Sequence, residues 1–316
     1  MLGEHTRSIT RIVIAPDHMF FITGSDDGSV KVWDSSKLER NIGHRSRQTH
    51  QHATDARITS LTFVENTHCF VSTASDGSIN VVKVDYSEAN SSSRYGKLRI
   101  ARKYHLSAGQ YAIWSEHYRS ENQSILLMAT NDSKIIALEL RTMTVLYELQ
   151  NPLHHGTPTC FCTDRKHHWL LLGTTHGVLD LWDLRFRLRL KAWGFPSGST
   201  IHRVSLLAVR GTRKNRIVIA GGTGQGEITV WDNEKFVCKE VYRTSACKDT
   251  PRAYNLIEID EEKAGGMLSR FATAVEPNSN AGVDRGIKAL AMGVHVPEDG
   301  SEPRHNFFIT AGPDWK

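Results

Sequence analysis

Short apolar runs alternate with small-residue turns along most of this chain. The segment from Phe20 to Asp34 sets the pattern: an apolar run leads into a turn with Asp27 and Gly28, and an alternating strand then ends in Trp33 and Asp34. An Asp-Gly pair between two apolar runs is typical of a β-hairpin, because glycine adopts positive φ freely and aspartate bonds the local backbone. The segment therefore predicts two antiparallel strands joined by a tight turn.

The same pattern returns further along the chain. It recurs at residues 70–82, 126–139, 169–183, 217–232 and 307–314. The aligned turn positions are 27, 76, 132, 176, 225 and 314. Repeats of the WD type are about 40–45 residues long, and longer ones carry loop insertions. The wide gap before position 314 therefore predicts either a further degenerate repeat or one repeat with a long insertion.

Two more strands accompany each hairpin. Upstream strands are expected at Ile9–Ile14, Ile58–Phe63 and Ile201–Leu207, and a strand follows each Trp-Asp pair, as from Leu184 to Trp193. Four strands per repeat predict an all-β fold, a WD-repeat β-propeller with about six blades represented and the last one truncated.

The repeat spacing also predicts where the blades lie. We expect one incomplete propeller over residues 1–316, with a flexible connection from Ser87 to Lys97 and a long insertion loop over residues 245–285. The predicted blades span residues 5–50, 52–103, 105–150, 154–195, 200–244 and 286–316, the last of them truncated.

Polar residues recur at fixed places in the repeats. In this repeat type a histidine, a strand serine or threonine, the turn aspartate and the tryptophan indole hydrogen-bond in series and satisfy buried polar groups. In the first repeat these are His5, Thr23 or Ser25, Asp27 and Trp33, and we interpret them as structural. The corresponding residues in later repeats are Asp76, Asp132, Trp182, Trp231 and Asp314.

Three segments together resemble a known family. They are Gly3-Glu4-His5 through Trp33-Asp34, Trp169 to Gly177 with Leu181 to Phe186, and Phe308 to Gly312 with Asp314. The chain resembles the C-terminal WD-repeat domain of the regulatory, protein-kinase-like vacuolar protein sorting subunit of the class III phosphatidylinositol 3-kinase. The most specific part is Trp182-Asp183 followed by Leu-Arg-Phe, because generic WD repeats rarely continue in this way.

The resemblance implies a propeller of about seven blades that acts as a scaffold for endosomal or vacuolar sorting and autophagy. The implied partners are the lipid kinase catalytic subunit and a Beclin-like coiled-coil subunit. The implied location is the cytoplasm, with peripheral attachment to endosomal, vacuolar or autophagic membranes through the complex. The family parent carries a serine/threonine protein-kinase-like domain, but this sequence has no Val-Ala-Ile-Lys, His-Arg-Asp or Asp-Phe-Gly motif, so we do not expect an enzyme.

Basic residues form two groups that either bind a partner or protect a strand edge. The 39 basic and 34 acidic side chains give a formal net charge of +5, too mild for a nucleic-acid binder but compatible with an acidic partner or an anionic surface. If residues 184–193 form one strand, the first group shares one strand face. The alternative is that these charges prevent edge pairing. The two groups are Arg185, Arg187, Arg189 and Lys191, and then Arg210, Arg213, Lys214 and Arg216.

Other candidate chemistry is weak. The glycine-rich run 221–226 precedes a strand rather than a helix, so it predicts a turn and no phosphate site. We expect solvated loops, not zinc ligands, at His44, His50, His52, His154, His155, His167 and His168. We therefore predict no cofactor, metal or catalytic site. A generic WD adaptor, such as a ubiquitin-ligase substrate receptor or an RNA-associated propeller, stays open as the alternative.

Overall fold

The computed structural model shows two compact units, Met1–Gln150 and Asn151–Lys316, each described by itself. The residues it describes are 4–35, 45–53, 55–89, 92–120, 122–207, 216–232, 234–243, 255–259, 286–295 and 305–312. Asp314, Arg210, Arg213, Lys214, His44 and most of the predicted 245–285 insertion lie outside these ranges.

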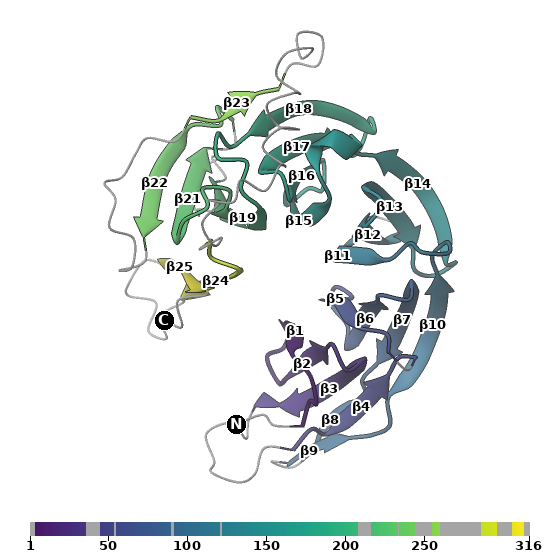
Figure 1. Cartoon of the computed structure of the whole chain (residues 1–316). Helices are drawn as coiled ribbons and strands as arrows, with labels where there is room; N and C mark the ends of the chain where they lie inside the picture. The colour runs from purple at the N-terminus through teal and green to yellow at the C-terminus, as the bar shows by residue number, and fades with distance from the viewer. Residues whose placement is uncertain are drawn as a thin grey trace. The chain divides into compact units, whose positions relative to one another are not determined.

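The first unit contains three four-stranded antiparallel sheets, here called blades 1 to 3 (Figure 1). Blade 1 consists of β1 (Ile9–Ile14), β2 (Phe20–Ser25), β3 (Ser29–Asp34) and β4 (Gln48–Gln51). Blade 2 consists of β5 (Ile58–Phe63), β6 (Cys69–Ala74), β7 (Ser78–Lys83) and β10 (Arg99–His105). Blade 3 consists of β11 (Ala112–Arg119), β12 (Ser124–Thr130), β13 (Lys134–Glu139) and β14 (Thr144–Gln150).

The second unit repeats this arrangement in blades 4 and 5. Blade 4 consists of β15 (Pro158–Thr163), β16 (Trp169–Thr174), β17 (Val178–Asp183) and β18 (Leu188–Gly194), with β23 (Ile257–Glu258) added to its outer edge. Blade 5 consists of β19 (Ile201–Leu207), β20 (Arg216–Gly221), β21 (Glu227–Asp232) and β22 (Cys238–Arg243). A two-stranded sheet follows, made of β24 (Ala289–His295) and β25 (His305–Ala311).

The predicted fold class, an all-β WD-repeat β-propeller, is confirmed by these successive sheets. The upstream strands predicted at Ile9–Ile14, Ile58–Phe63 and Ile201–Leu207 are confirmed residue for residue. The fourth strand predicted from Leu184 starts later, at Leu188, because residues 184–187 form a turn.

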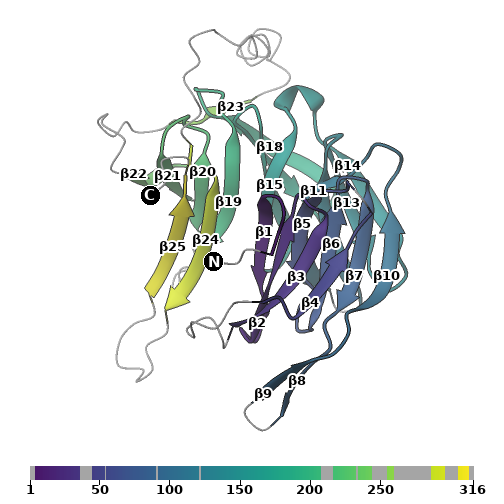
Figure 2. The same ribbon diagram turned by 60° about the horizontal axis from the view of Figure 1, so that its bottom comes forward.

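The predicted flexible connection from Ser87 to Lys97 is wrong. It contains a hairpin of β8 (Tyr86–Ala89) and β9 (Ser92–Tyr95), which extends beyond the sheets in Figure 2. At the base of the hairpin, the rings of Tyr86 and Tyr95 lie 5.8 and 6.4 Å from the ring of Phe20 in blade 1. Aromatic contacts of this kind stabilise beyond the area they bury, so the two tyrosines hold the base of the hairpin in place.

The second and third strands of a blade are buried on both faces. All six residues of β2 and all seven of β12 are buried, because each sheet packs against the next one in its unit. One core cluster joins blades 1 and 2 through Phe20, Ile22, Ile58, Phe70 and Val82. Burying both faces explains why these strands are nearly continuous apolar runs rather than alternating ones.

A bulge in the first strand links neighbouring blades. Each first strand carries one extra residue opposite its second strand, and these are Thr10, Thr59, Ile113, Thr159 and His202. The Thr10 hydroxyl lies 3.1 Å from the carbonyl oxygen of Gly24 in its own blade and 2.7 Å from that of Ile58 in the next. Thr159 repeats this contact with Gly173 and Ile201. In blades 1 and 4 the bulge therefore places a hydroxyl between two blades.

We predict that Gly24→Ala lowers the free energy of unfolding by about 1–3 kcal/mol, the usual cost of overpacking a core. A Cβ atom on Gly24 would lie 2.6 Å from Cγ2 of Ile58 across the blade interface, and one on Gly173 would lie 2.7 Å from Cγ2 of Ile201. Denaturant unfolding of Gly24→Ala in the wild-type and in the Ile58→Ala background measures this contact. The loss should shrink in the Ile58→Ala background, and an equal loss in both would contradict the steric explanation.

Candidate interaction site

The four polar residues predicted for blade 1 lie together. Nδ1 of His5 is 3.2 Å from Oδ2 of Asp27, Nε2 of His5 is 2.7 Å from the Thr23 hydroxyl, and the Trp33 indole donates to that hydroxyl over 2.8 Å. The Asp27 carboxylate can only accept, so Nδ1 of His5 carries the ring proton and donates it to Asp27. Nε2 of the neutral ring then accepts the proton of the Thr23 hydroxyl, whose oxygen accepts from the Trp33 indole. The series of bonds runs through the blade and leaves no member for other chemistry.

Asp27 also fixes the turn. Burial acts to raise the pKa of this carboxyl group, but hydrogen bonds from the Ser29 hydroxyl and backbone N–H, with further bonds from Thr6 and His5, hold it well below its ordinary value. The backbone N–H of Ser29 is 2.8 Å from Oδ1 of Asp27. Asp76 in blade 2 accepts the same two bonds from Ser78. These aspartates therefore stay charged and act as local turn formers.

The polar residue next to the tryptophan position changes strand between blades. It belongs to a cross-strand pair whose third-strand residue stands two positions before Trp33, Trp182 or Trp231 in blades 1, 4 and 5, and before Val82 or Leu138 in blades 2 and 3. The pairs are Thr23–Lys31, Ser72–Asn80, Met128–Ile136, Leu172–Asp180 and Ile219–Thr229. Blades 1 and 2 carry a hydroxyl on the second strand, blade 3 is apolar at both places, and blades 4 and 5 carry the polar group on the third strand.

Blade 4 centres on a carboxylate that the repeat pattern did not predict. Asp180 is fully buried, with Nδ1 of His155 2.8 Å from Oδ1 and Nδ2 of Asn151 2.9 Å from Oδ2. The Trp182 indole donates to Oδ1 of Asn151 over 3.1 Å rather than to a second-strand hydroxyl. Leu172 occupies the place of Thr23, which explains why Nε2 of His155 is buried with no hydrogen-bond partner among the described residues.

Blades 3 and 5 show further variants. In blade 3, Nε2 of Gln110 donates to Asp132 over 2.9 Å, in place of a histidine. In blade 5, the Trp231 indole donates to Thr229 on its own strand over 2.7 Å. Each residue of the predicted network that lies in the described ranges therefore forms a hydrogen bond in or next to its own blade.

The expectation that the histidine clusters are solvated is wrong for His50, His52 and His155, which are buried. His52 takes the place of His5 in blade 2, with Nε2 2.7 Å from the Ser72 hydroxyl and Nδ1 2.8 Å from that of Ser78. The sequence contains a signal for the burial of His52. This histidine comes a few residues before the strand Ile58–Phe63, just as His5 comes a few residues before the strand Ile9–Ile14.

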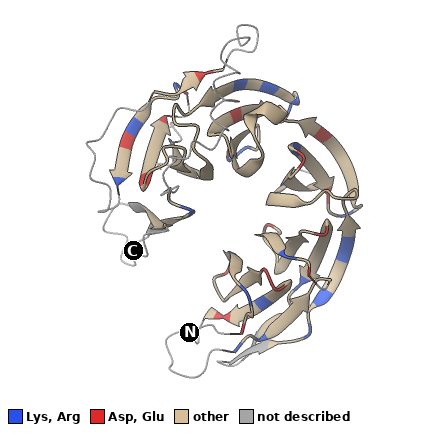
Figure 3. Cartoon of the chain, in the orientation of Figure 1, with Lys and Arg blue, Asp and Glu red and all other residues tan. Residues whose placement is uncertain are grey.

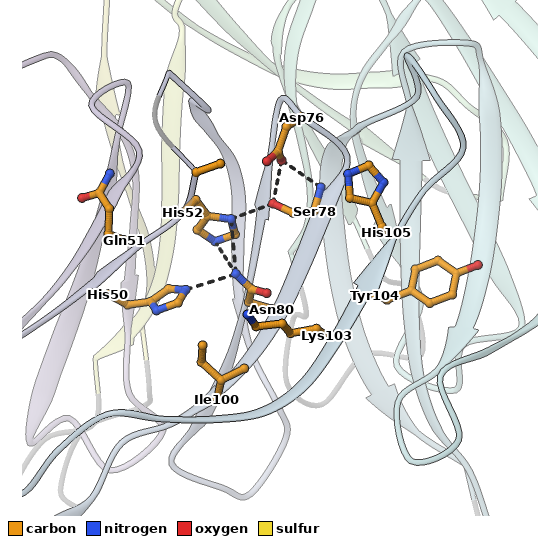
Figure 4. Close-up of a pocket in the computed structure, with 11 residues that line it drawn as sticks. His50, Gln51, His52, Asp76, Ser78, Asn80, Ile100, Lys103, Tyr104 and His105 are labelled. Atoms are coloured by element: carbon orange, nitrogen blue, oxygen red, sulfur yellow. Dashed lines mark hydrogen bonds between the residues drawn. The ribbon is translucent and has the colours of Figure 1, made fainter.

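A cavity of about 420 Å³ lies between β4 of blade 1 and β7 and β10 of blade 2 (Figure 4). His50, His52 and Asn80 form its buried wall, and Nδ2 of Asn80 is 3.1 Å from Nε2 of His50. Burial lowers the pKa of His52 from 6.5 to about 4, and the neighbouring His50 and Lys103 add to this effect. Burial and Lys103 lower the pKa of His50 as well. Both imidazoles are therefore neutral at neutral pH.

The four cations predicted to share one strand face do not do so. Arg185 and Arg187 lie in the turn before β18, and a bulge at Leu190 separates Arg189 from Lys191. Arg185 pairs with Asp183 at 2.6 Å, Arg189 turns inward to Asp180 at 3.5 Å, and Lys191 pairs with Glu258 at 3.0 Å. The turn and the bulge break the alternation on which the prediction depended.

Of the second basic group, the structure describes Arg216, which starts β20 and pairs with Glu240. Figure 3 shows Lys and Arg on the outer strands β10 and β18. On β10 these are Arg99, Arg102 and Lys103, which the repeat pattern did not single out because their strand lacks a preceding Trp-Asp pair. The described residues contain no group of three or more His, Cys, Asp or Glu that could hold a metal ion. They also contain no helix long and apolar enough to cross a membrane.

Comparisons with known proteins agree with the repeat pattern. The family model described as WD domain, G-beta repeat matches residues 1–34 and 43–82. The chain is 32% identical over 301 residues to a putative serine/threonine-protein kinase VPS15 of Komagataella pastoris. The aligned region covers 92% of this chain and 22% of that protein. It is 28% identical to the VPS15 kinase of Saccharomyces cerevisiae, covering 78% of the chain and 17% of that protein. For the VPS15 kinase of Arabidopsis thaliana the identity is 30%, over 77% of the chain and 17% of that protein.

We predict that Thr23→Val destabilises the chain by about 2–3 kcal/mol, because it leaves the Trp33 indole and Nε2 of His5 buried without this partner. Urea unfolding measures the loss. Thr62→Val is the matched control, since Thr62 is half-buried on β5 and its hydroxyl makes no hydrogen bond to a described residue. Equal stability of the two variants would contradict the role given to Thr23.

We predict that His52 makes the chain less stable as the pH falls from 6.5 to 4. The unfolded chain binds a proton on this histidine near pH 6.5, whereas the folded chain binds it only near pH 4, so acid favours unfolding in this window by up to about 3 kcal/mol. In His52→Gln, the free energy of unfolding should change less between these pH values. His18→Asn, at an exposed position with positive φ, is the control and should keep the wild-type pH profile. Unchanged pH dependence in His52→Gln would contradict the assignment.

Proposed function

This WD-repeat chain is a relative of the VPS15 serine/threonine-protein kinases, and we propose that it serves as a non-catalytic interaction scaffold. The observation that carries the proposal is the match to VPS15 over 77–92% of the chain. The chain spans about a fifth or less of the length of these relatives. The kinase activity in their names is therefore a property that we do not assign to this chain.

The bonding inside the blades supports a non-catalytic role. The histidines, aspartates and tryptophans that could suggest chemistry are used to hold strands together, as in the series from His5 through Thr23 to Trp33. A catalytic site needs titratable groups that converge on a substrate position. Outside the cavity between blades 1 and 2, titratable groups of the repeat network bond one another, as His5 bonds Asp27 and His155 bonds Asp180.

The proposed partners are the catalytic subunit of the class III phosphatidylinositol 3-kinase and a Beclin-like coiled-coil subunit. In such a complex the chain would work in the cytoplasm and reach endosomal, vacuolar or autophagic membranes peripherally. Rigid blades present loops and outer strands at fixed positions, which suits a protein that brings several partners together. Of the basic residues singled out in the sequence, Arg187 and Lys191 at the outer edge of blade 4 are those we place at a partner surface.

We predict that the chain co-purifies with both proposed partners when the three are co-expressed with an affinity tag on the chain. Size-exclusion chromatography should give one peak that contains all three proteins, because a scaffold contacts each partner directly or through the other. A tagged WD-repeat protein of similar size from another family is the control and should elute alone. Recovery of the chain with ubiquitin-ligase subunits or RNA, and without either proposed partner, would contradict the proposal in favour of a generic adaptor.

A further inference from the structure

The outer strand of blade 4 is paired along only part of its outer edge. β17 pairs with β18 from Leu188 to Gly194 on the inner side. On the outer side, β23 pairs with β18 only at Trp193–Glu258 and Gly194–Ile257, and the N–H of Ile259 bonds the carbonyl oxygen of Ala192 at 2.9 Å. Among the described residues, no strand pairs with the outer side of β18 from Leu188 to Lys191. Within the described part of the chain, the edge therefore carries an added strand at the Trp193–Gly194 end and none at the Leu188–Lys191 end (Figure 1).

Apolar side chains mark the open half. Phe186, Leu188 and Leu190 are 69%, 60% and 53% exposed. Arg189, the cation between the two leucines, is only 20% exposed at its side chain because it turns in to Asp180. The Arg189 guanidinium group is therefore directed to Asp180 and does not stand between the exposed leucines. An exposed apolar edge of this kind is a surface that a further strand can cover.

The segment already docked shows which side chains the edge accepts. Glu258 of β23 lies with its carboxylate 3.0 Å from the ammonium group of Lys191. One residue further, Ile259 is buried against Val178 and Ala192. In this docked segment, the acidic side chain of Glu258 pairs with Lys191 of β18, and the next side chain, Ile259, packs against apolar residues of blade 4. An acidic residue next to an apolar one along an extended strand therefore fits this edge.

We propose that the open half of the β18 edge binds an extended segment of a partner protein with alternating acidic and apolar residues, as an added strand of blade 4. The inference rests on the proposed scaffold function and names one surface that serves it. Backbone hydrogen bonds to Leu188–Lys191 give such binding its affinity, and the side chains give its specificity. The apolar residues cover Phe186, Leu188 and Leu190, and the acidic ones lie beside Lys191, next to the Glu258 carboxylate that already pairs with it.

The test uses an N-acetylated, fluorescein-labelled peptide of four Glu-Val repeats and fluorescence anisotropy with the whole chain. We expect binding that weakens at least tenfold in Leu190→Asp, which places a negative charge on the half-exposed bulge residue without emptying the core. Lys191→Glu should weaken binding similarly, whereas Lys83→Glu, the same charge change at an exposed site on β7, should leave it unchanged. A peptide of four Lys-Val repeats should bind at least tenfold more weakly.

Hydrogen exchange measures whether the peptide adds to the sheet as a strand. The peptide should slow the exchange of backbone amides at residues 188–191 and leave those of β14 unchanged. Slow exchange there in the chain alone would mean that the edge is already paired and would overturn the proposal. Two other results would also overturn it: self-association that Leu190→Asp abolishes without peptide binding, or binding of 30% phosphatidylserine vesicles but not of the peptide.

A failure of the peptide tests is distinguishable from a failure of the scaffold function. If the chain still co-purifies with its proposed partners and Leu190→Asp does not affect this, the edge proposal alone is wrong. If wild-type chain recovers no partner although the peptide binds at the β18 edge, the assigned partners are wrong and the edge remains a binding surface.

Discussion

The structure depends on one constraint: the second and third strands of each blade are covered on both faces. Strands such as β2 and β12 have no face in water, so every polar group placed on them must find a partner inside the protein. Thr23 of β2 meets this demand by bonding to His5 and Trp33, and on the first strand the Thr10 hydroxyl lies close to a carbonyl oxygen of its own blade and to one of the next. When neighbouring sheets pack together, the polar groups between them must therefore form hydrogen bonds inside the protein.

The same constraint explains why the polar network varies. A buried tryptophan needs an acceptor for its indole, but the acceptor can stand on either of two paired strands. Thr23 provides it from the second strand, whereas Thr229 provides it from the third, and Asn151 reaches in from a preceding segment. Blade 3 avoids the need altogether, since Leu138 occupies the tryptophan place and its neighbours are apolar. The geometry is kept while the residue that satisfies it changes.

Much of this fold could be predicted from the sequence, because strand periodicity, Asp-Gly turns and Trp-Asp endings are local signals. What could not be predicted depended on contacts between distant residues. The burial of His50 and His52 comes from the approach of the neighbouring blade, and the inward turn of Arg189 comes from a bulge and from Asp180 on the adjacent strand. Likewise, the sequence shows Leu172 in place of a hydroxyl but not that Asn151 replaces it.

The distribution of satisfied groups also determines where recognition can occur. Polar side chains of the repeat network bond one another in the inner strands and turns, with Nε2 of His155 as an exception among the described residues, so a partner gains little by approaching them. Outer strands differ, because only one of their edges is paired by the blade itself. In blade 4 the second edge is partly paired by β23, whose Glu258 meets Lys191, while the three apolar side chains beyond it are exposed. For the proposed scaffold function, such edges and the loops are therefore the surfaces best suited to partner recognition.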